Sequence, residues 1–361
     1  MRVLQCIDSL RGDGAERQLT YLSEGLVRLG VGVDVVYLRD GTYGPRLRAS
    51  GAVAHELGMR GPLPLVSDLF DIIRVRRIDV VQAWLGRMCF SGGVAGCLAR
   101  RPWLYSERSV RTLDRGWKAT VRGLVAKSAA AIVANSEAGA ALWRPSAGAR
   151  VHVVPNGIEQ DAIAATAPAA RRELGVPDDA ELIVYAGRFV APKNIALLAD
   201  ALGGVLRVRP RAFALLCGEG EELELFRARV AAAGVAARCL TPGYRRDLWA
   251  VLKSADVAVA PSRHEGRPNV VLEVMASGCP LVVSDIAPHR ECVPRDAALW
   301  FSPESVPAAT AALLHALDDR EAAAARAARA SAAIRGQSID AMARAYADLY
   351  ARVAPTAASA S

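Results

Sequence analysis

The sequence predicts an α/β protein made of two doubly wound domains, each with a parallel sheet. Its length of 361 residues exceeds one ordinary core and suits two domains of typical size. Short apolar runs rich in β-branched residues alternate with longer stretches of helical periodicity, which is typical of parallel α/β architecture. This alternation stops near residue 158 and then starts again, so we expect a domain boundary there.

The first series of predicted strands begins at Arg2–Ile7 and is followed by a predicted helix at Ala15–Leu29. All its strands are short, apolar and bounded by turn-forming residues. The other strands of the series are Val31–Leu38, Val53–Leu57, Asp79–Ala83, Trp103–Ser106, Ala131–Ala134 and Val151–Val154.

A linker is predicted at Gly157–Asp179, because this stretch holds Pro168, Pro177 and many alanines. The second series follows it, with strands at Leu182–Ala186, Phe213–Cys217, Arg238–Leu240, Val257–Ala260 and Leu281–Ser284. Three consecutive helices without another strand then close the chain, at Ala308–Leu317, Glu321–Ile334 and Ser338–Val353.

The composition excludes several classes of protein. With 52% hydrophobic and 23% charged residues, the chain is not a disordered protein. Its seven cysteines are an odd set without close pairs, which argues against a disulfide framework or a zinc site. The N-terminus resembles no signal peptide, and no apolar run reaches the roughly eighteen residues of a membrane span, so we expect a cytoplasmic protein.

The net charge of +8 predicts an anionic partner. Nucleic acid is disfavoured because aromatic residues, on which bases stack, make up only 6% of the chain. Since ligands of open α/β sheets gather at the carboxyl ends of strands, the loops after strands are the places to inspect.

Two of these loops are rich in glycine. Gly12 and Gly14 lie between the first strand and its helix, where they form either a ligand loop or a plain tight turn, because the full dinucleotide fingerprint is absent. In the second domain, Gly218 and Gly220 flank Glu219 and suit a tight loop beneath a nucleotide, or merely a turn.

A pair of cations follows the first strand of the second domain. Gly187 ends this strand, Arg188 comes next and Lys193 lies at the start of the following helix. A guanidinium contacts two phosphate oxygens at once, and an ammonium beside a helix N-terminus adds a point charge, so the pair would hold a diphosphate. The alternative is two solvated surface cations.

The segment from Ala260 to Asp285 carries two glutamates after a predicted strand. Glu265 lies in the loop, Pro268 at the start of a helix and Glu273 in its second turn, and Gly278 ends the helix. Ionised carboxylates accept hydrogen bonds from paired hydroxyls, so both side chains suit sugar or ribose diols in one cleft. An ordinary amphipathic helix is the alternative.

This segment resembles the signature of the family 4 retaining glycosyltransferases, also called group 1 glycosyltransferases. The matching features are the two glutamates with seven residues between them and the run from Met275 to Ser284. The resemblance extends over nearly the whole chain and also includes Gly12–Glu16, Asn135 with Ser136, Asn156 with Gly157, and Arg188 with Lys193.

The resemblance implies a GT-B fold, in which two Rossmann-like domains face each other across a cleft. It implies that residues 1–157 plus 338–353 bind the acceptor, with the last helix returning to this domain. Residues 158–337 would then bind the nucleotide-sugar donor, and residues 354–361 would form a tail.

The resemblance also implies roles for individual residues. Arg188 and Lys193 would clamp the diphosphate, Glu265 would bind the transferred sugar, and these three would be catalytic, while Glu273 would hold the ribose. The other donor-binding residues would be Gly12, Gly14, Gly187, Gly218, Glu219, Gly266, Arg267, Pro268 and Asn269. The implied reaction retains the anomeric configuration and uses no metal and no cofactor, since the nucleotide sugar is a substrate.

One departure from the family concerns the acceptor side. Many relatives carry a histidine after the fourth strand, whereas this chain has Gln82, Trp84 and Arg87 there. Either Arg87 takes an orienting or phosphate-binding role or the acceptor is oriented differently. The acceptor-side residues we expect are Trp84, Arg87, Asn135 and Asn156. Of the histidines, His264 and His289 are interpreted as ordinary loop residues, with reach into the cleft as the alternative.

A basic segment, Arg108–Lys127, supplies much of the excess charge, and Trp117, Val121, Leu124 and Val125 lie in it at helical spacing. Either this is an amphipathic helix that binds an anionic membrane surface, or its apolar stripe packs into the core. On the first interpretation the protein is peripheral on the inner membrane face.

We therefore expect transfer of a sugar from a nucleotide diphosphate, UDP by family frequency, to a hydroxyl of a glycan or lipid-linked acceptor. The alternatives are a GT-B phosphorylase or epimerase and a non-catalytic protein that binds nucleotide sugars.

Overall fold

The computed structural model describes residues 1–11, 14–108 and 123–354, and the chain divides into two compact units. Unit 1 comprises Met1–Gly157 together with Gln337–Ser361, and unit 2 comprises Ile158–Gly336. Of the sequence-based interpretations, Gly12, most of the Arg108–Lys127 segment and nearly all of the tail lie outside the described residues.

Unit 1 is built on a seven-stranded sheet in the order β3-β2-β1-β4-β5-β6-β7, with all neighbours parallel. The order reverses direction at β1, as a doubly wound sheet requires. Its strands are β1 (Arg2–Ser9), β2 (Gly32–Arg39), β3 (Val53–Glu56), β4 (Val80–Trp84), β5 (Trp103–Glu107), β6 (Ala131–Ala134) and β7 (Val151–Val153).

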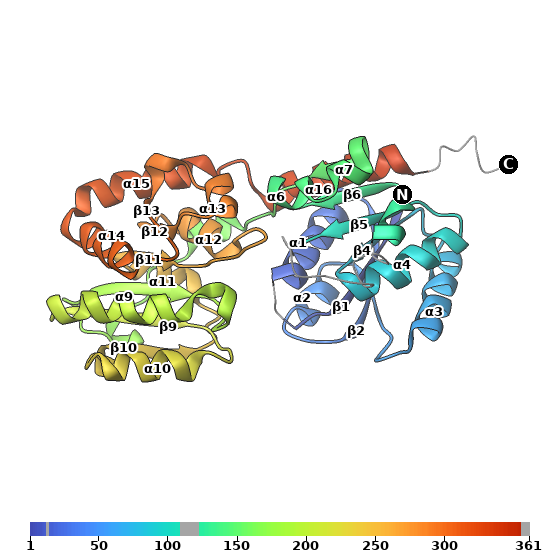
Figure 1. The fold of residues 1–361 in the computed structure, drawn as a ribbon. Helices are drawn as coiled ribbons and strands as arrows, with labels where there is room; N and C mark the ends of the chain where they lie inside the picture. Colours follow the sequence, from blue (N-terminus) through green and yellow to red (C-terminus); the bar gives the residue numbers. More distant parts are fainter. Residues whose placement is uncertain (12–13, 109–122, 355–361) are drawn as a thin grey trace. The chain divides into compact units, whose positions relative to one another are not determined.

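Helices cover both faces of this sheet (Figure 1). The helices of unit 1 are α1 (Gly14–Arg28), α2 (Gly44–Ala49), α3 (Pro62–Val75), α4 (Gly86–Leu98), α6 (Glu137–Ala141), α7 (Arg144–Ala147) and α16 (Ile339–Val353). Leucines of α1 and the aromatic residues of α16 pack on one face, and α3 and α4 pack on the other. Because both faces are buried, the strands are apolar on both sides.

Unit 2 has a six-stranded parallel sheet in the order β10-β9-β8-β11-β12-β13. Its strands are β8 (Glu181–Ala186), β9 (Ala212–Cys217), β10 (Cys239–Gly243), β11 (Val257–Ala260), β12 (Leu281–Ser284) and β13 (Leu299–Phe301). The two parallel α/β sheets confirm the predicted fold class, although the sequence reasoning missed the three-residue strand β13.

The helices of unit 2 are α8 (Gln160–Ala165), α9 (Ile195–Val208), α10 (Leu223–Ala232), α11 (Leu248–Ser254), α12 (Asn269–Ser277), α13 (Ala287–Cys292), α14 (Val306–Asp318) and α15 (Arg320–Ala333). One face of the sheet packs against α9, α10 and α14, and the other packs against α8, α11, α12 and α15. The predicted closing helices α14, α15 and α16 are confirmed within two residues at each end.

The predicted linker at Gly157–Asp179 is wrong. Ile158, Ile163, Leu174 and Val176 from this stretch are buried in the core of unit 2. Proline and alanine suggested a loose connection, but α8 and a short 3₁₀ turn give the apolar residues regular positions against the sheet. Residues 158–179 therefore belong to unit 2, and the chain passes directly from unit 1 to unit 2 between Gly157 and Ile158.

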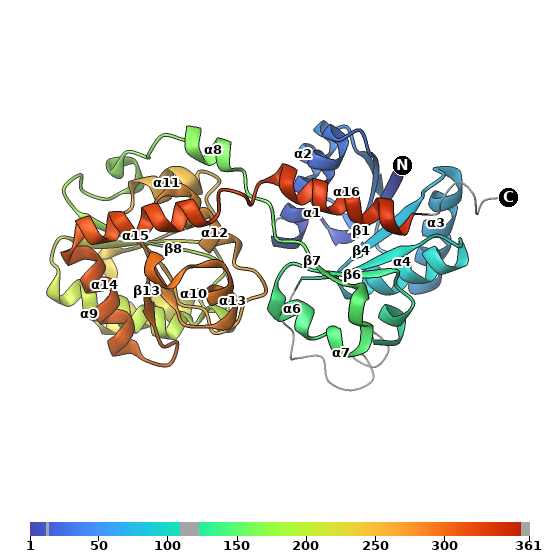
Figure 2. The same ribbon diagram turned by 90° about the horizontal axis from the view of Figure 1, so that it is seen from above.

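The last helix, α16, returns to unit 1 and lies beside α1 (Figure 2). Glycine allows this close approach, because a Cβ at Gly25 would stand 2.5 Å from the Cβ of Ala343. Gln18 fixes the end of β7 and its loop by hydrogen-bonding both the N–H and the C=O of Gly157 at 3.0 Å. Among the described residues, no helix is both long and apolar enough to cross a membrane.

Candidate functional site

The predicted donor-binding residues of unit 2 follow three neighbouring strands. Gly187 and Arg188 come after β8, Gly218 after β9 and Glu265 after β11. Since the carboxyl ends of parallel strands meet at one edge of a sheet, the structure brings these loops together. We call this place the unit 2 edge.

Two glycines hold the loops of the unit 2 edge in contact. Gly218 has a φ of +146°, and a Cβ there would stand 2.0 Å from the carbonyl oxygen of Gly187. Gly220 has a φ of +152°, and its Cβ would stand 2.3 Å from the carbonyl oxygen of Phe189. Any other residue would separate the two loops, so the glycines predicted as a nucleotide loop have a structural reason here.

An ion pair joins two of the predicted catalytic residues. Lys193, predicted at the start of the helix, ends a 3₁₀ turn two residues before α9, and Asn194 with a φ of +59° makes the transition. The Lys193 Nζ donates to Glu265 Oε1 at 2.5 Å, and the Ser262 Oγ donates to the same oxygen at 2.7 Å. Both charged side chains are mostly buried, with 20% and 13% exposed.

The electrostatics of this pair keep Glu265 ionised. Burial alone raises the pKa of the Glu265 carboxyl, but the charge of Lys193 and the hydrogen bonds from Lys193 and Ser262 outweigh burial. The net result is a pKa below the usual glutamate value. The site therefore holds a carboxylate, an acceptor for hydroxyl protons, at neutral pH.

A small pocket lies against the ion pair. Its lining comes from β8, from the loop after β11 and from the first turn of α12, and comprises Tyr185, Ala186, Lys193, Ala260, Pro261, Ser262, Glu265, Pro268, Val270 and Val271. Lys193 and Glu265 thus line one pocket, whereas Glu273 is not among its lining residues.

Glu273 is held by a contact that the sequence did not reveal. It lies in the second turn of α12, as predicted, and is 4% exposed. The Trp249 Nε1 in α11 donates to Glu273 Oε1 at 2.9 Å. This bond fixes the direction of the carboxylate and leaves it with further acceptor capacity.

The other predicted donor residues surround these groups. Arg188 and Glu219 are exposed, and the Tyr185 hydroxyl donates to the Arg188 carbonyl at 2.9 Å. Arg267 lies 3.7 Å from Glu291, and burial lowers the pKa of its guanidinium. The remaining three, Gly266, Pro268 and Asn269, are buried or half-buried between β11 and α12.

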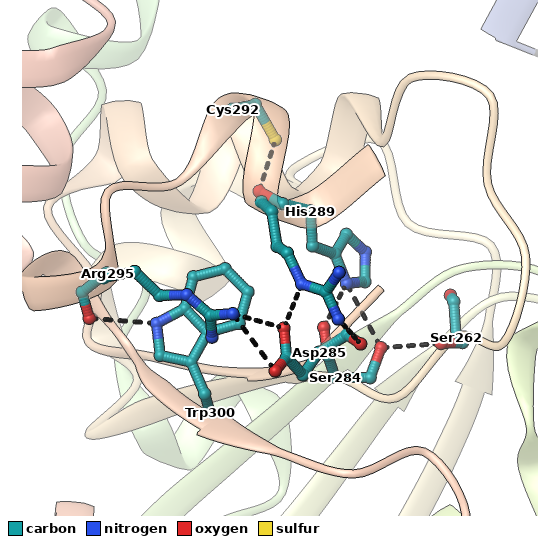
Figure 3. Close-up of polar contacts among 8 residues, drawn as sticks. Ser262, Ser284, Asp285, His289, Cys292, Arg295 and Trp300 are labelled. Atoms are coloured by element: carbon teal, nitrogen blue, oxygen red, sulfur yellow. Dashed lines mark hydrogen bonds and ion pairs between the residues drawn. The ribbon is translucent and has the colours of Figure 1, made fainter. Parts of the chain in front are cut away.

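The two loop histidines differ. His264 is exposed, but His289 is fully buried in α13 (Figure 3). Its Nδ1 lies 2.8 Å from the Ser284 carbonyl oxygen and must carry the hydrogen, and the Ser284 Oγ donates to the Ser262 carbonyl at 2.6 Å. Burial lowers the pKa of His289, so it is neutral and ties the end of β12 to the loop that holds Glu265.

The carboxyl edge of the unit 1 sheet, which we call the unit 1 edge, gathers around Arg108 at the end of β5. The Arg108 guanidinium stacks on the Trp84 ring, with its Cζ 3.8 Å from the ring centroid. Its two terminal nitrogens donate to Asn156 Oδ1 at 3.1 Å and to the Tyr346 hydroxyl at 2.6 Å. Arg108 therefore contacts two predicted acceptor-side residues, Trp84 and Asn156. In the sequence this arginine belongs to the segment considered for membrane binding.

Beneath Arg108, buried polar groups tie the sheet to α16. The Trp84 Nε1 donates to Gln5 Oε1 at 2.6 Å, and Gln5 Nε2 donates to the Tyr350 hydroxyl at 2.9 Å. The Tyr350 hydroxyl in turn donates to Gln82 Oε1, and Gln82 Nε2 donates to Ser106 at 2.8 Å. Gln82 is thus a structural residue of this network.

The other acceptor-side predictions are not brought to Arg108. Arg87 lies at the start of α4 and donates to the backbone carbonyl of Arg60. Asn135 is buried directly after β6. Gly14, which was predicted to bind the donor, begins α1 in unit 1 and so does not belong to the unit 2 edge. In the basic segment, Leu124 is exposed while Val125 packs against the core, so the apolar stripe is divided where the structure describes it.

Two families of known proteins match this chain. Residues 167–333 match the glycosyl transferases group 1, and residues 12–162 match glycosyltransferase family 4. The chain belongs to the group 1 glycosyltransferases. The predicted donor-binding residues of unit 2 lie in the first matched range, and the residues around Arg108 lie mostly in the second.

Comparison with individual proteins shows how far the likeness extends. An uncharacterized glycosyltransferase of Methanocaldococcus jannaschii is 32% identical over 138 residues, which is 37% of this chain and 35% of that protein. The putative glycosyltransferase EpsF of Bacillus subtilis is 27% identical over 312 residues, 79% of each chain. Anabaena HepE, solved with UDP-glucose, superposes with a TM-score of 0.88 at 20% identity, covering 98% of this chain and 100% of that one. This likeness confirms the GT-B fold.

Sequence reasoning missed Trp249, Arg108 and Tyr346. The sequence could have pointed to Trp249, because a buried indole N–H needs a hydrogen-bond acceptor. Arg108 and Tyr346 are far apart in sequence and meet only because α16 returns. Among the described residues, no group of three or more histidine, cysteine or acidic side chains is arranged to hold a metal ion.

Proposed function

We propose that this group 1 glycosyltransferase moves a sugar from a UDP-sugar to a hydroxyl of a glycan or lipid-linked acceptor, with retention at the anomeric carbon. The observation that carries the proposal is the Lys193 and Glu265 pair in a pocket at the unit 2 edge, with the held carboxylate Glu273 nearby in sequence. UDP is favoured because the structural neighbour HepE was solved with UDP-glucose.

In this proposal unit 2 binds the donor. Lys193 uses one of its three N–H donors for Glu265, so two are left for diphosphate oxygens. Glu265 accepts the hydrogen bonds from Lys193 and Ser262 at Oε1, which leaves Oε2 for a hydroxyl of the transferred sugar. Glu273 holds the ribose diol, and Arg188 adds a second cation beside the diphosphate.

The chemical step follows from these contacts. The bond between the anomeric carbon and the β-phosphate oxygen breaks, and the acceptor oxygen bonds to the same face of that carbon. The acceptor proton passes to the departing diphosphate. Negative charge grows on this leaving group, so Lys193 and Arg188 stabilise the transition state more than the ground state, by about 2–4 kcal/mol for one such donor.

The test is release of UDP from a panel of UDP-sugars by the purified chain, with and without a glycan and lipid-linked acceptor pool. We expect acceptor-dependent UDP release, a product whose anomeric configuration equals that of the donor, and the same rate in EDTA because protein cations neutralise the leaving group. Dependence on inorganic phosphate instead of an acceptor would indicate a phosphorylase. UDP-sugar binding without any turnover would overturn the proposal.

A further inference from the structure

Arg108 is a half-buried cation whose stacking and hydrogen-bond partners among the described residues are neutral. It directly follows β5, and the partners of its guanidinium are a tryptophan ring, an amide oxygen and a phenol hydroxyl. The preceding residue, Glu107, accepts a hydrogen bond from Trp143 Nε1 at 2.9 Å, and its charge counteracts only in part the lowering of the Arg108 pKa by burial. Within the described residues, no carboxylate forms an ion pair with this guanidinium.

Most of the N–H groups of the Arg108 guanidinium also lack a hydrogen-bond acceptor among the described residues. A guanidinium has five N–H donors, and the described residues accept from only two of them. The Nε is buried without a hydrogen-bond partner. A buried charge without a counter-ion costs free energy unless something compensates it, and burial indeed lowers the pKa of this group.

Other arginines of unit 1 do not share this condition. Arg46 pairs with Glu24 at 2.5 Å, and Arg76 pairs with Asp34 at 2.7 Å. Arg108 instead is fixed in place by stacking and two hydrogen bonds, yet the residue as a whole stays partly exposed. A cation that is oriented in advance, reachable from solvent and short of acceptors is suited to receive an anion.

We propose that Arg108 is an anion-binding residue of unit 1 and that its ligand is a phosphate group of a transfer substrate. The inference rests on the proposed function in that the phosphate belongs either to the acceptor or to the donor diphosphate. A phosphate oxygen accepts from the N–H groups of Arg108 that have no acceptor among the described residues, and its charge balances the guanidinium. Arg108, and not Arg87, then supplies the cation on the acceptor side.

The experiment compares the full chain with Arg108→Gln and with a matched control, Arg74→Gln. Arg74 also stacks on an aromatic ring, that of Phe70, but it is exposed at the end of α3. Calorimetry measures the affinity for UDP first, and then the affinity of the UDP-saturated protein for inorganic pyrophosphate. We expect Arg108→Gln to weaken one of these affinities about tenfold or more and Arg74→Gln to change neither by more than about twofold.

The two arms identify the source of the phosphate. Loss of pyrophosphate binding in the presence of UDP assigns Arg108 to an acceptor-borne phosphate. Loss of UDP affinity assigns it to the donor diphosphate. Equal affinities of Arg108→Gln and the parent in both arms overturn the inference, as does an equal loss in Arg74→Gln, which would reflect net charge alone.

Two further measurements keep the outcomes separate. If Arg108→Gln does not give a cooperative thermal transition, Arg108→Lys replaces it, and loss of the planar fork should weaken the affected affinity about threefold. UDP release from UDP-sugars tests the proposed function independently. Arg108-dependent anion binding without turnover would sink the proposed function alone, and turnover without Arg108-dependent binding would sink this inference alone.

Discussion

The cations at the two sheet edges have different kinds of partners. At the unit 2 edge, Lys193 lies 2.5 Å from a carboxylate that is itself held by Ser262. At the unit 1 edge, the stacking and hydrogen-bond partners of Arg108 among the described residues are all neutral. The difference teaches that Lys193 at the unit 2 edge has a carboxylate partner before any ligand binds, whereas Arg108 at the unit 1 edge has no ion pair with a described residue. A ligand of Lys193 must therefore share this cation with Glu265 or displace that carboxylate. A ligand of Arg108 has no ion pair with a described residue to break.

The largest expected effect tests the pairing at the unit 2 edge. Lys193→Ala should lower turnover about a hundredfold, because the leaving diphosphate loses a cation. It should also cost about 3 kcal/mol of unfolding free energy, since Glu265 stays buried without its partner. The double variant Lys193→Met with Glu265→Gln should regain most of the stability but not the turnover. Enzyme assays and denaturant unfolding measure the two quantities.

The control for this pair is Arg263→Ala in the same loop. Arg263 pairs with Glu304 at 3.1 Å, but both side chains are exposed, so stability should change by less than about 1 kcal/mol. If Lys193→Ala were as stable as Arg263→Ala, the pair at the unit 2 edge would be no stronger than a surface contact, and the contrast between the edges would fail.

The second effect concerns the carboxylate held by Trp249. Glu273→Gln should reduce UDP affinity by roughly 1.5–3 kcal/mol through loss of charge-assisted bonds to the ribose. Trp249→Phe removes only the bond that directs the carboxylate, so it should cost about 0.5–1.5 kcal/mol. The exposed Glu224→Gln is the control for calorimetry. Equal UDP binding by Glu273→Gln and the parent would show that this carboxylate has only a structural role, as the acceptor for Trp249 in α11.

The third effect measures the neutral network of the unit 1 edge. Tyr350→Phe leaves the amides of Gln5 and Gln82 without their shared hydroxyl in a fully buried place. The expected loss of unfolding free energy is about 1–3 kcal/mol, against a negligible change for Tyr244→Phe, whose ring is 58% exposed. Thermal unfolding at one pH compares the two variants. No difference between them would mean that the network does not hold α16.

The smallest effect is a dependence on pH. The pKa of Glu265 lies below its usual value, so its ionised form stabilises the fold above that usual value and this contribution disappears as pH falls through the lowered pKa. As pH falls below the usual glutamate pKa of about 4.3, the parent should therefore lose stability relative to the double variant Lys193→Met with Glu265→Gln. Melting temperatures at pH values above and below this pKa provide the check, and parallel curves would contradict it.

The same contrast explains what could be predicted from the sequence. The unit 2 edge was predictable, because Gly187, Lys193, Glu265 and Glu273 lie in short segments whose local geometry follows from glycine, proline and helix periodicity. Even there, the pairing of Lys193 with Glu265 was not predicted, since it depends on how the loops after β8 and β11 meet.

The unit 1 edge could not be predicted in this way. Arg108 and Tyr346 are 238 positions apart, and their contact exists only because α16 returns to the first sheet. The charge pattern around Arg108 suggested a surface helix, although its guanidinium stacks on the Trp84 ring. The strand β13 was missed for a simpler reason, because three residues carry too little periodicity to be recognised.

The return of α16 has a consequence for the order in which the protein takes shape on the ribosome. A Cβ at Gly157 would lie 2.8 Å from the Cα of Ile339, so the chain leaves unit 1 and rejoins it at one point, with the whole of unit 2 inserted between. Translation delivers domains from the N-terminus onward, at about 5–20 residues per second. Unit 1 nevertheless stays open until its last helix emerges, while unit 2 is already complete. Tyr346 lies only ten residues after the end of unit 2, so for roughly 0.5–2 seconds a nascent chain would have a finished unit 2 and a unit 1 in which Arg108 still lacks Tyr346.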